Sequence, residues 1–123
     1  MIYVIDDDVS VRRALARLMA SADLRAKTFA SGEEFLALED PANADCLVMD
    51  IHLGGMTGLQ LQERLLAMGS DTPIIFITAF DDDATRMRAQ HAGAQAYFSK
   101  PFDDQALLDA IEISMRSRTP KTC

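Results

Sequence analysis

The sequence predicts one α/β domain in which a parallel sheet is covered by helices on both faces, a doubly wound arrangement. Five short apolar segments alternate with five helical patterns along the 123 residues. Three of the apolar segments are continuous and rich in isoleucine and valine, which is typical of strands buried on both faces. Strands that alternate with helices favour a parallel sheet, and right-handed crossovers then place helices on both faces.

Apolar residues locate the five expected strands and the first helix. The expected strands cover Ile2–Ile5, Ala26–Phe29, Cys46–Met49, Ile74–Ile77 and Ala96–Phe98. The first helix is indicated by apolar residues three and four positions apart, namely Val11, Ala14, Leu15, Leu18, Met19 and Ala22. Arg12, Arg13 and Arg17 lie off this apolar stripe and are interpreted as a solvated face, with contact to a kinase as the alternative.

The other four helices are shorter or more polar. Residues 31–34, Ser-Gly-Glu-Glu, form a capping box that predicts a short second helix. Glycine ends the third and fourth patterns. The third pattern contains Leu61, Leu65 and Met68, the fourth covers Asp81–Ala92, and the fifth contains Leu108, Ile111 and Met115. We expect the domain to span residues 1–117, with residues 118–123 as a linker stub or frayed tail.

Composition excludes several classes of protein. With 12 basic and 19 acidic residues the net charge is −7, so the domain has no basic footprint for nucleic acid and suits anionic lipid poorly. The sequence contains no apolar run as long as a membrane span, and Met1 leads directly into the first strand without a signal peptide. Two cysteines, Cys46 and Cys123, make no disulfide framework, so a cytoplasmic location is expected.

Chemically active side chains follow the strands. Asp6, Asp7 and Asp8 follow the first strand, Asp50 the third, Thr78 the fourth and Lys100 the fifth. The carboxyl ends of parallel strands meet at one edge of the sheet, where such folds bind ligands. Clustered carboxylates with waters suit Mg²⁺, and one carboxylate near the metal can attack a phosphoryl group. The metal, an ammonium and a hydroxyl would stabilise the transferred group.

This constellation resembles the receiver domain of two-component response regulators over about residues 2 to 116. The motifs that carry the resemblance are Val-Ile-Asp-Asp-Asp, Cys-Leu-Val-Met-Asp ending at Asp50, Gly58, Thr78-Ala79 and Lys100-Pro101, in that order. Two sequence segments are most similar to the FixJ-type subgroup, namely Asp-Asp-Asp-Val-Ser-Val-Arg-Arg-Ala-Leu and Lys-Pro-Phe-Asp-Asp-Gln-Ala-Leu-Leu-Asp-Ala-Ile. The resemblance implies a flavodoxin-like (βα)5 fold with strand order 2-1-3-4-5.

The resemblance also implies a role for each residue at the strand ends. Asp50 would be the phosphoacceptor and Asp7 a direct Mg²⁺ ligand, while Asp6 would hold the ion largely through water. The backbone carbonyl of His52 would be a further ligand, since Mg²⁺ prefers oxygen to imidazole nitrogen. Thr78 and Lys100 would bind the phosphoryl group. The peptide bond between Lys100 and Pro101 would be cis.

A phosphorylation switch is implied as well. A sensor histidine kinase would phosphorylate Asp50, Thr78 would move inward, and Tyr97 would follow it. This would repack the face made by the fourth helix, fifth strand and fifth helix, through which family members often dimerise. Such a domain catalyses only its own phosphorylation and dephosphorylation. DNA would be bound only through a separate helix-turn-helix output domain, and no membrane is implied.

Two positions depart from the family pattern. Gly54-Gly55 stand where many members have Pro-Gly, which predicts a more mobile loop before Mg²⁺ binds. Phe80 stands two residues after Thr78, where many members of the subgroup have histidine. Phe80 and His52 together are therefore candidates to control the water that hydrolyses the phosphoryl group.

Other readings remain open from sequence alone. Asp8 is interpreted as a helix cap, and Tyr97 is either a core aromatic or the switch. The rival function is an Mg²⁺-dependent phosphohydrolase with an aspartate nucleophile, for which Asp6 and Asp8 match the Asp-x-Asp spacing, although the chain leaves no room for a cap domain. A third reading is a degenerate receiver that only dimerises.

Overall fold

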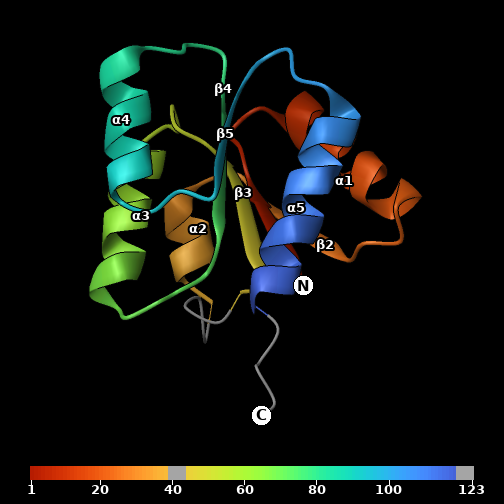
Figure 1. The fold of residues 1–123 in the computed structure, drawn as a ribbon, viewed down its shortest axis with the longest axis horizontal. Helices are drawn as coiled ribbons and strands as arrows, with labels where there is room; N and C mark the ends of the chain where they lie inside the picture. Colours follow the sequence, from red (N-terminus) through yellow and green to blue (C-terminus); the bar gives the residue numbers. More distant parts are fainter. Residues whose placement is uncertain (39–43, 119–123) are drawn as a thin grey trace.

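The computed structural model describes residues 1–38 and 44–118 of the chain (Figure 1). The strands are β1 (Ile2–Ile5), β2 (Ala26–Phe29), β3 (Cys46–Asp50), β4 (Ile74–Thr78) and β5 (Ala96–Ser99). The helices are α1 (Val9–Ser21), α2 (Gly32–Leu36), α3 (Gly58–Ala67), α4 (Asp83–His91) and α5 (Asp104–Arg118). Three strands end one residue later than expected, and their last residues are Asp50, Thr78 and Ser99.

The five strands form one parallel sheet in the order β2-β1-β3-β4-β5. This confirms the predicted doubly wound α/β fold and its strand order. Helices α1 and α5 cover one face of the sheet, while α2, α3 and α4 cover the other (Figure 1). Because β1 and β3 are adjacent and β2 lies beyond β1, the direction in which the strands are added reverses between β1 and β3. Ligands of such folds bind beyond the strand ends at this point.

Each face of the sheet packs its own hydrophobic core. One core joins alternate strand residues to α1 and α5, with Leu15, Met19, Leu107 and Ile111 fully or almost fully buried. The other joins the remaining strand residues to α2, α3 and α4, and it includes Phe35, Leu61 and Ala89. All residues of β3 and β4 are buried, which explains why their sequences are continuous apolar runs.

Side chains cap the helices close to the predicted positions. Ser31 caps α2 by accepting a hydrogen bond from the Glu34 amide, but the Glu34 carboxylate binds the Ala30 amide, so the reciprocal half of the predicted box is displaced by one residue. A complete capping box occurs instead at α3, between Thr57 and Gln60. Sequence reasoning missed this second box.

Helices α4 and α5 differ slightly from the expected ranges. Helix α4 begins two residues later than predicted because Asp82 acts as its cap and binds the Thr85 amide. Helix α5 extends through Arg118, and the rest of the predicted tail, residues 119–123, lies outside the described residues. Among the helices of the described ranges, none has the length and apolar character needed to cross a membrane.

Candidate functional site

The predicted site residues come from four strands that end at the same edge of the sheet. Asp6 directly follows β1, Asp50 ends β3, Thr78 ends β4 and Lys100 directly follows β5. The side chains of Asp6, Asp50 and Thr78 are buried, with residue exposures of 1%, 7% and 0%. Because Asp6 and Asp50 are buried among apolar strands, each ionised carboxylate needs a partner of opposite charge or a hydrogen-bond donor.

Lys100 is the partner of both carboxylates. Its Nζ lies 2.9 Å from Oδ2 of Asp50 and 3.1 Å from Oδ2 of Asp6. The residues involved are 94 and 50 positions apart in the chain, so this contact exists only because the parallel sheet brings the strand ends together. The Lys100–Pro101 peptide bond is cis.

The protonation of the cluster reflects its burial. Desolvation raises the pKa of Asp6 above its ordinary value, although hydrogen bonds from the Asp8 amide and from Lys100 oppose the change. Desolvation acts to lower the pKa of Lys100, but the hydrogen bonds and charges of Asp50 and Asp6 outweigh it, and the pKa is raised. The ammonium therefore stays charged at neutral pH and balances the carboxylates.

The three aspartates after β1 have different surroundings. Asp6 accepts a hydrogen bond from the Asp8 amide at 2.9 Å, and Asp8 caps α1 through the Ser10 amide at 2.8 Å. Asp7 is exposed, and a Cβ on Gly54 would lie 3.9 Å from its Oδ2, so its carboxylate faces the loop after β3. Asp8 therefore acts as the helix cap that the sequence indicated.

The donor set fits a hard divalent cation. Asp6, Asp7 and Asp50 offer carboxylate oxygens, and the His52 amide binds Oδ1 of Asp50 at 2.9 Å, which places the His52 backbone beside the acidic cluster. Oxygen donors of this kind suit Mg²⁺, which keeps several waters and requires few protein ligands. Within the described ranges, no three acidic, histidine or cysteine side chains converge as a preformed cage.

Thr78 does not contact Asp50 or Lys100 through its hydroxyl. Its Oγ1 accepts a hydrogen bond from the Phe80 amide at 3.1 Å and donates one to the Phe80 carbonyl at 3.4 Å. Asp81, the next residue, accepts a hydrogen bond from Ser99 at 3.0 Å and pairs with Arg86 of α4 at 2.9 Å. The loop after β4 is thus tied to β5 and to α4.

Tyr97 packs against the core on the side of α2, α3 and α4. Its hydroxyl is buried and has no hydrogen-bond partner among the described residues. Burial raises the pKa of Tyr97, and the charges of Asp81 and Asp82 add to this effect. Tyr97 is half-buried in this structure, and its expected inward move after phosphorylation stays a prediction.

The loop after β3 contains the two glycines that depart from the family pattern. Gly55 has a φ of +77°, and a Cβ there would lie 2.6 Å from Oε2 of Glu33. Gly54 is outside the left-handed region, and its nearest neighbour to an added Cβ is 3.9 Å away. Only Gly55 therefore needs glycine for its conformation.

We predict opposite effects for alanine at these two positions. Gly54→Ala is expected to raise the free energy of unfolding by about 0.4 to 1 kcal/mol, because it restricts the unfolded chain without a clash. Gly55→Ala is expected to lower it by about 1 to 2 kcal/mol, because an L-residue is strained there. Urea denaturation without Mg²⁺ measures both, and equal effects would contradict this account of the loop.

The side chains of His52 and Phe80 are in contact. Their rings meet edge to face with centroids 5.6 Å apart, and Phe80 is 71% exposed. The two residues come from the loops after β3 and β4. The two side chains named above as candidates to control the water that hydrolyses the phosphoryl group are therefore neighbours.

Sequence reasoning missed one contact of the site. Arg12 was grouped with Arg13 and Arg17 as a solvated face, but its Nη1 donates a hydrogen bond to the backbone carbonyl of Asp6 at 2.7 Å. Its position one turn after the Asp8 cap was the available signal.

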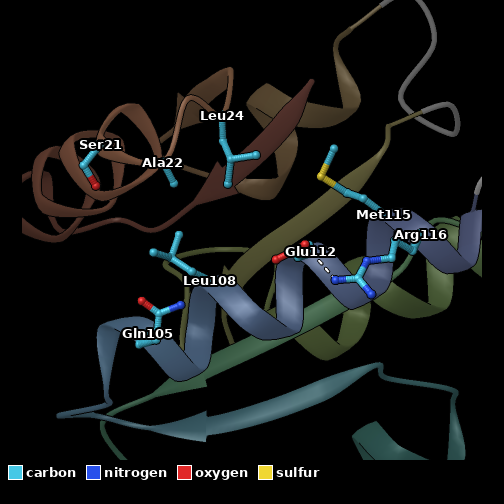
Figure 2. A pocket seen from close by; sticks show the side chains of 8 residues that line it. All are labelled: Ser21, Ala22, Leu24, Gln105, Leu108, Glu112, Met115 and Arg116. Carbon is cyan, nitrogen blue, oxygen red and sulfur yellow. Dashed lines mark hydrogen bonds and ion pairs between the residues drawn. The ribbon is translucent and has the colours of Figure 1, made fainter.

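A groove of about 820 Å³ lies elsewhere (Figure 2). It runs between the end of α1, the turn before β2 and α5 (Figure 2). Its lining residues are Ser21, Ala22, Leu24, Gln105, Leu108, Glu112, Met115 and Arg116. None of the site residues described above lines it, so the groove is separate from the carboxylate cluster.

Comparison with known proteins places the chain in a family. The family model for the response regulator receiver domain matches residues 2–112. Nodulation protein W of Bradyrhizobium diazoefficiens is 41% identical over 111 residues, which cover 90% of this chain and 49% of that protein. Response regulator protein TmoT of Ectopseudomonas mendocina is 38% identical over 116 residues, covering 94% of this chain and 53% of that protein.

Solved structures of response regulators are similar to this chain in fold and sequence. Response regulator StyR is 43% identical with a TM-score of 0.87, over 94% of this chain and 59% of that one. The structure of FixJ-N is 30% identical with a TM-score of 0.85, over 94% and 92%. The chain spans about half the length of the curated relatives it matches. It belongs to the response regulator receiver family, the signalling domains of two-component systems, and its relatives include FixJ-type transcriptional regulators.

Proposed function

We propose that Asp50 accepts a phosphoryl group from the phosphohistidine of a sensor kinase. Receiver domains of response regulators are phosphorylated by such kinases. The observation that carries the proposal is the contact of Lys100 with Asp50 and Asp6 at the edge of the sheet. An oxygen of Asp50 attacks phosphorus, the P–N bond breaks, and the histidine takes the bonding electrons, which leaves an acyl phosphate on Asp50.

The other residues at this edge would assist the transfer. Receiver domains of this family generally bind Mg²⁺, and we propose that Asp7, Asp50 and the His52 carbonyl ligate it here, with Asp6 acting largely through water. The bound ion would balance charge on the phosphoryl oxygens. Lys100 already lies 2.9 Å from Asp50 and would bind a phosphoryl oxygen from there.

We propose that Thr78 transmits the change. Its hydroxyl is bonded to Phe80, so a move toward the phosphoryl group would break these bonds and release the loop after β4. Asp81 in that loop is tied to Ser99 and Arg86. Release of the loop would therefore alter the face formed by α4, β5 and α5.

The proposed output of the switch is a homodimer through this α4-β5-α5 face. Arg86, Arg88 and Arg116 could form ion pairs between copies at this face, but each already pairs with an acidic residue within the chain. A dimer would have to exchange these exposed pairs, whose individual contributions are small.

Tyr97 can be tested apart from Asp50. Tyr97→Phe is expected to raise the free energy of unfolding by up to about 1 kcal/mol, because it removes a buried hydroxyl without a partner. Tyr97→Ala is expected to weaken phosphorylation-dependent dimerisation at least about fivefold, which corresponds to a coupling energy of about 1 kcal/mol. Urea denaturation and sedimentation measure these effects. Dimerisation unchanged in both variants would remove Tyr97 from the switch.

We propose a cytoplasmic regulator whose output is transcription through a helix-turn-helix domain in a longer protein. The names of FixJ, TdiR and nodulation relatives that are about twice as long support this proposal. The net charge of −7 disfavours contact of this domain with the DNA backbone, so we propose that DNA is bound by the other domain. Buried Cys46 is a free thiol, which suits a reducing compartment.

The function is tested with acetyl phosphate as the donor. We expect the intact mass to increase by one phosphoryl group when Mg²⁺ is present, and we expect EDTA to slow this at least about a hundredfold. Acetyl phosphate suits the test because it needs no kinase. A chain that gains no phosphoryl group with Mg²⁺ would support the degenerate, dimerising receiver instead.

A further inference from the structure

We propose that Arg12 is a positioning residue for magnesium: it fixes the turn that carries Asp7. This inference rests on the proposed function, since it assigns a role toward the same ion. The residue lies in the first turns of α1, beside the three aspartates that follow β1. It is half-buried, whereas its neighbour Arg13 is exposed.

Arg12 holds both ends of the acidic turn. Its side chain donates from Nη1 to the Asp6 carbonyl at 2.7 Å, and its own amide donates to the Asp8 carbonyl at 3.0 Å. The Asp8 amide in turn binds the Asp6 carboxylate at 2.9 Å. The Asp6 amide is held by the Phe29 carbonyl at 3.1 Å, and Arg12 supplies the side-chain bond to the carbonyl on the other side of Asp6, next to Asp7.

The direction of Asp7 depends on this backbone. The Asp6 carbonyl belongs to the peptide group that joins Asp6 to Asp7, so its orientation sets the position of the Asp7 Cα. The Asp7 carboxylate itself makes no hydrogen bond or ion pair with the residues that the structure describes. Without the bond from Arg12, the carbonyl of the peptide group that leads into Asp7 would lose its side-chain donor, and Asp7 has no side-chain bond among the described residues to replace it.

Charge and position predict opposite results when Arg12 is replaced. A guanidinium beside three aspartates repels a cation, so charge alone predicts that its removal strengthens Mg²⁺ binding. Loss of a group that orients a metal ligand typically weakens metal binding by 10- to 100-fold. Arg13 provides the matched control, since it has the same charge on the same helix, is exposed, and makes no hydrogen bond or ion pair with the turn in the part of the chain that the structure describes.

The test is calorimetric titration of the wild type, Arg12→Gln and Arg13→Gln with MgCl₂. We expect Arg12→Gln to bind Mg²⁺ about tenfold more weakly than the wild type, and Arg13→Gln to bind as tightly as the wild type or more tightly. Circular dichroism checks that both variants are folded. If Arg12→Gln does not fold, Arg12→Met, which keeps the apolar stem, is titrated in its place.

The outcomes separate this inference from the proposed function. If the wild type binds Mg²⁺ and the Arg12 variant binds as tightly as the Arg13 variant, Arg12 has no positioning role and the proposed function stands. If the wild type binds no Mg²⁺, the proposed function itself is overturned and the inference falls with it.

Discussion

Asp50→Asn is expected to abolish phosphoryl uptake from acetyl phosphate in the presence of Mg²⁺, a decrease of at least about a hundredfold. The amide cannot serve as the nucleophile, yet it keeps the shape of the side chain and an oxygen that accepts the hydrogen bond from the His52 amide. We therefore expect the variant to fold, with a free energy of unfolding within about 1 to 2 kcal/mol of the wild type. Intact-mass measurement reports the uptake.

Asp8→Asn is the matched control for Asp50→Asn. Asp8 lies in the same acidic region, but its described role is to cap α1, and asparagine caps helices as well as aspartate does. This variant is expected to take up the phosphoryl group at a rate close to that of the wild type. If Asp50→Asn continues to turn over acetyl phosphate, the nucleophile is another residue, and the phosphohydrolase that uses Asp6 becomes the better account.

Lys100→Met is expected to lower the free energy of unfolding by about 2 to 4 kcal/mol near neutral pH. The change leaves Asp6 and Asp50 buried and facing each other without the cation that lies 3.1 and 2.9 Å from them. The estimate lies toward the low end of values for buried pairs because the Lys100 side chain is 21% exposed. Urea denaturation measures the loss.

The deficit of Lys100→Met should depend on pH. Without the cation, the pKa of Asp6 is expected to rise further above its already raised value. The folded state then binds more protons than the unfolded state above pH 3.8, so the variant loses stability as pH rises through that window. The difference from the wild type should thus be smaller near pH ~5 than near pH ~7.

In the wild type, the raised pKa of Lys100 predicts a second pH range, at high pH, in which the stability of the fold changes. The ion pair contributes fully below the unfolded pKa of 10.5 and is lost as pH rises through the higher folded value. Lys27→Met is the control, because Lys27 is exposed, and within the described ranges its ammonium forms no ion pair and lies only over the Phe29 ring, 5.7 Å from the ring centroid. We expect it to change stability by less than about 1 kcal/mol. Equal losses for both lysines would contradict the proposed charge balance.

Only the resemblance to receiver domains implied the strand order, whereas the residues themselves were sufficient to predict the positions of Asp6, Asp50, Thr78 and Lys100 at one edge of the sheet. These follow from apolar strands whose last residues are polar, and a parallel sheet leaves such residues only one edge to occupy. The capping role of Asp8 was also confirmed, because helix caps depend on local sequence.

Other features could not be predicted because they depend on tertiary geometry. The position of Arg12 one turn after Asp8 indicated that it lies near the turn, but the bond from its side chain to the Asp6 carbonyl depends on the path of the chain from β1 to α1. The same holds for Asp81, whose contacts with Ser99 and Arg86 join three elements. The burial of the Tyr97 hydroxyl depends on the packing of the core beside α4.

A crystal structure with Mg²⁺ and beryllofluoride, a phosphoryl analogue, tests the central claim most directly. We expect beryllofluoride to be bound to the Asp50 carboxylate and one Mg²⁺ to be ligated by Asp7, Asp50 and the His52 carbonyl. The Lys100 side chain is expected to point toward the beryllofluoride. An ion that Asp7 and Asp50 do not share, or a Lys100 side chain directed away from the two carboxylates, would contradict the account.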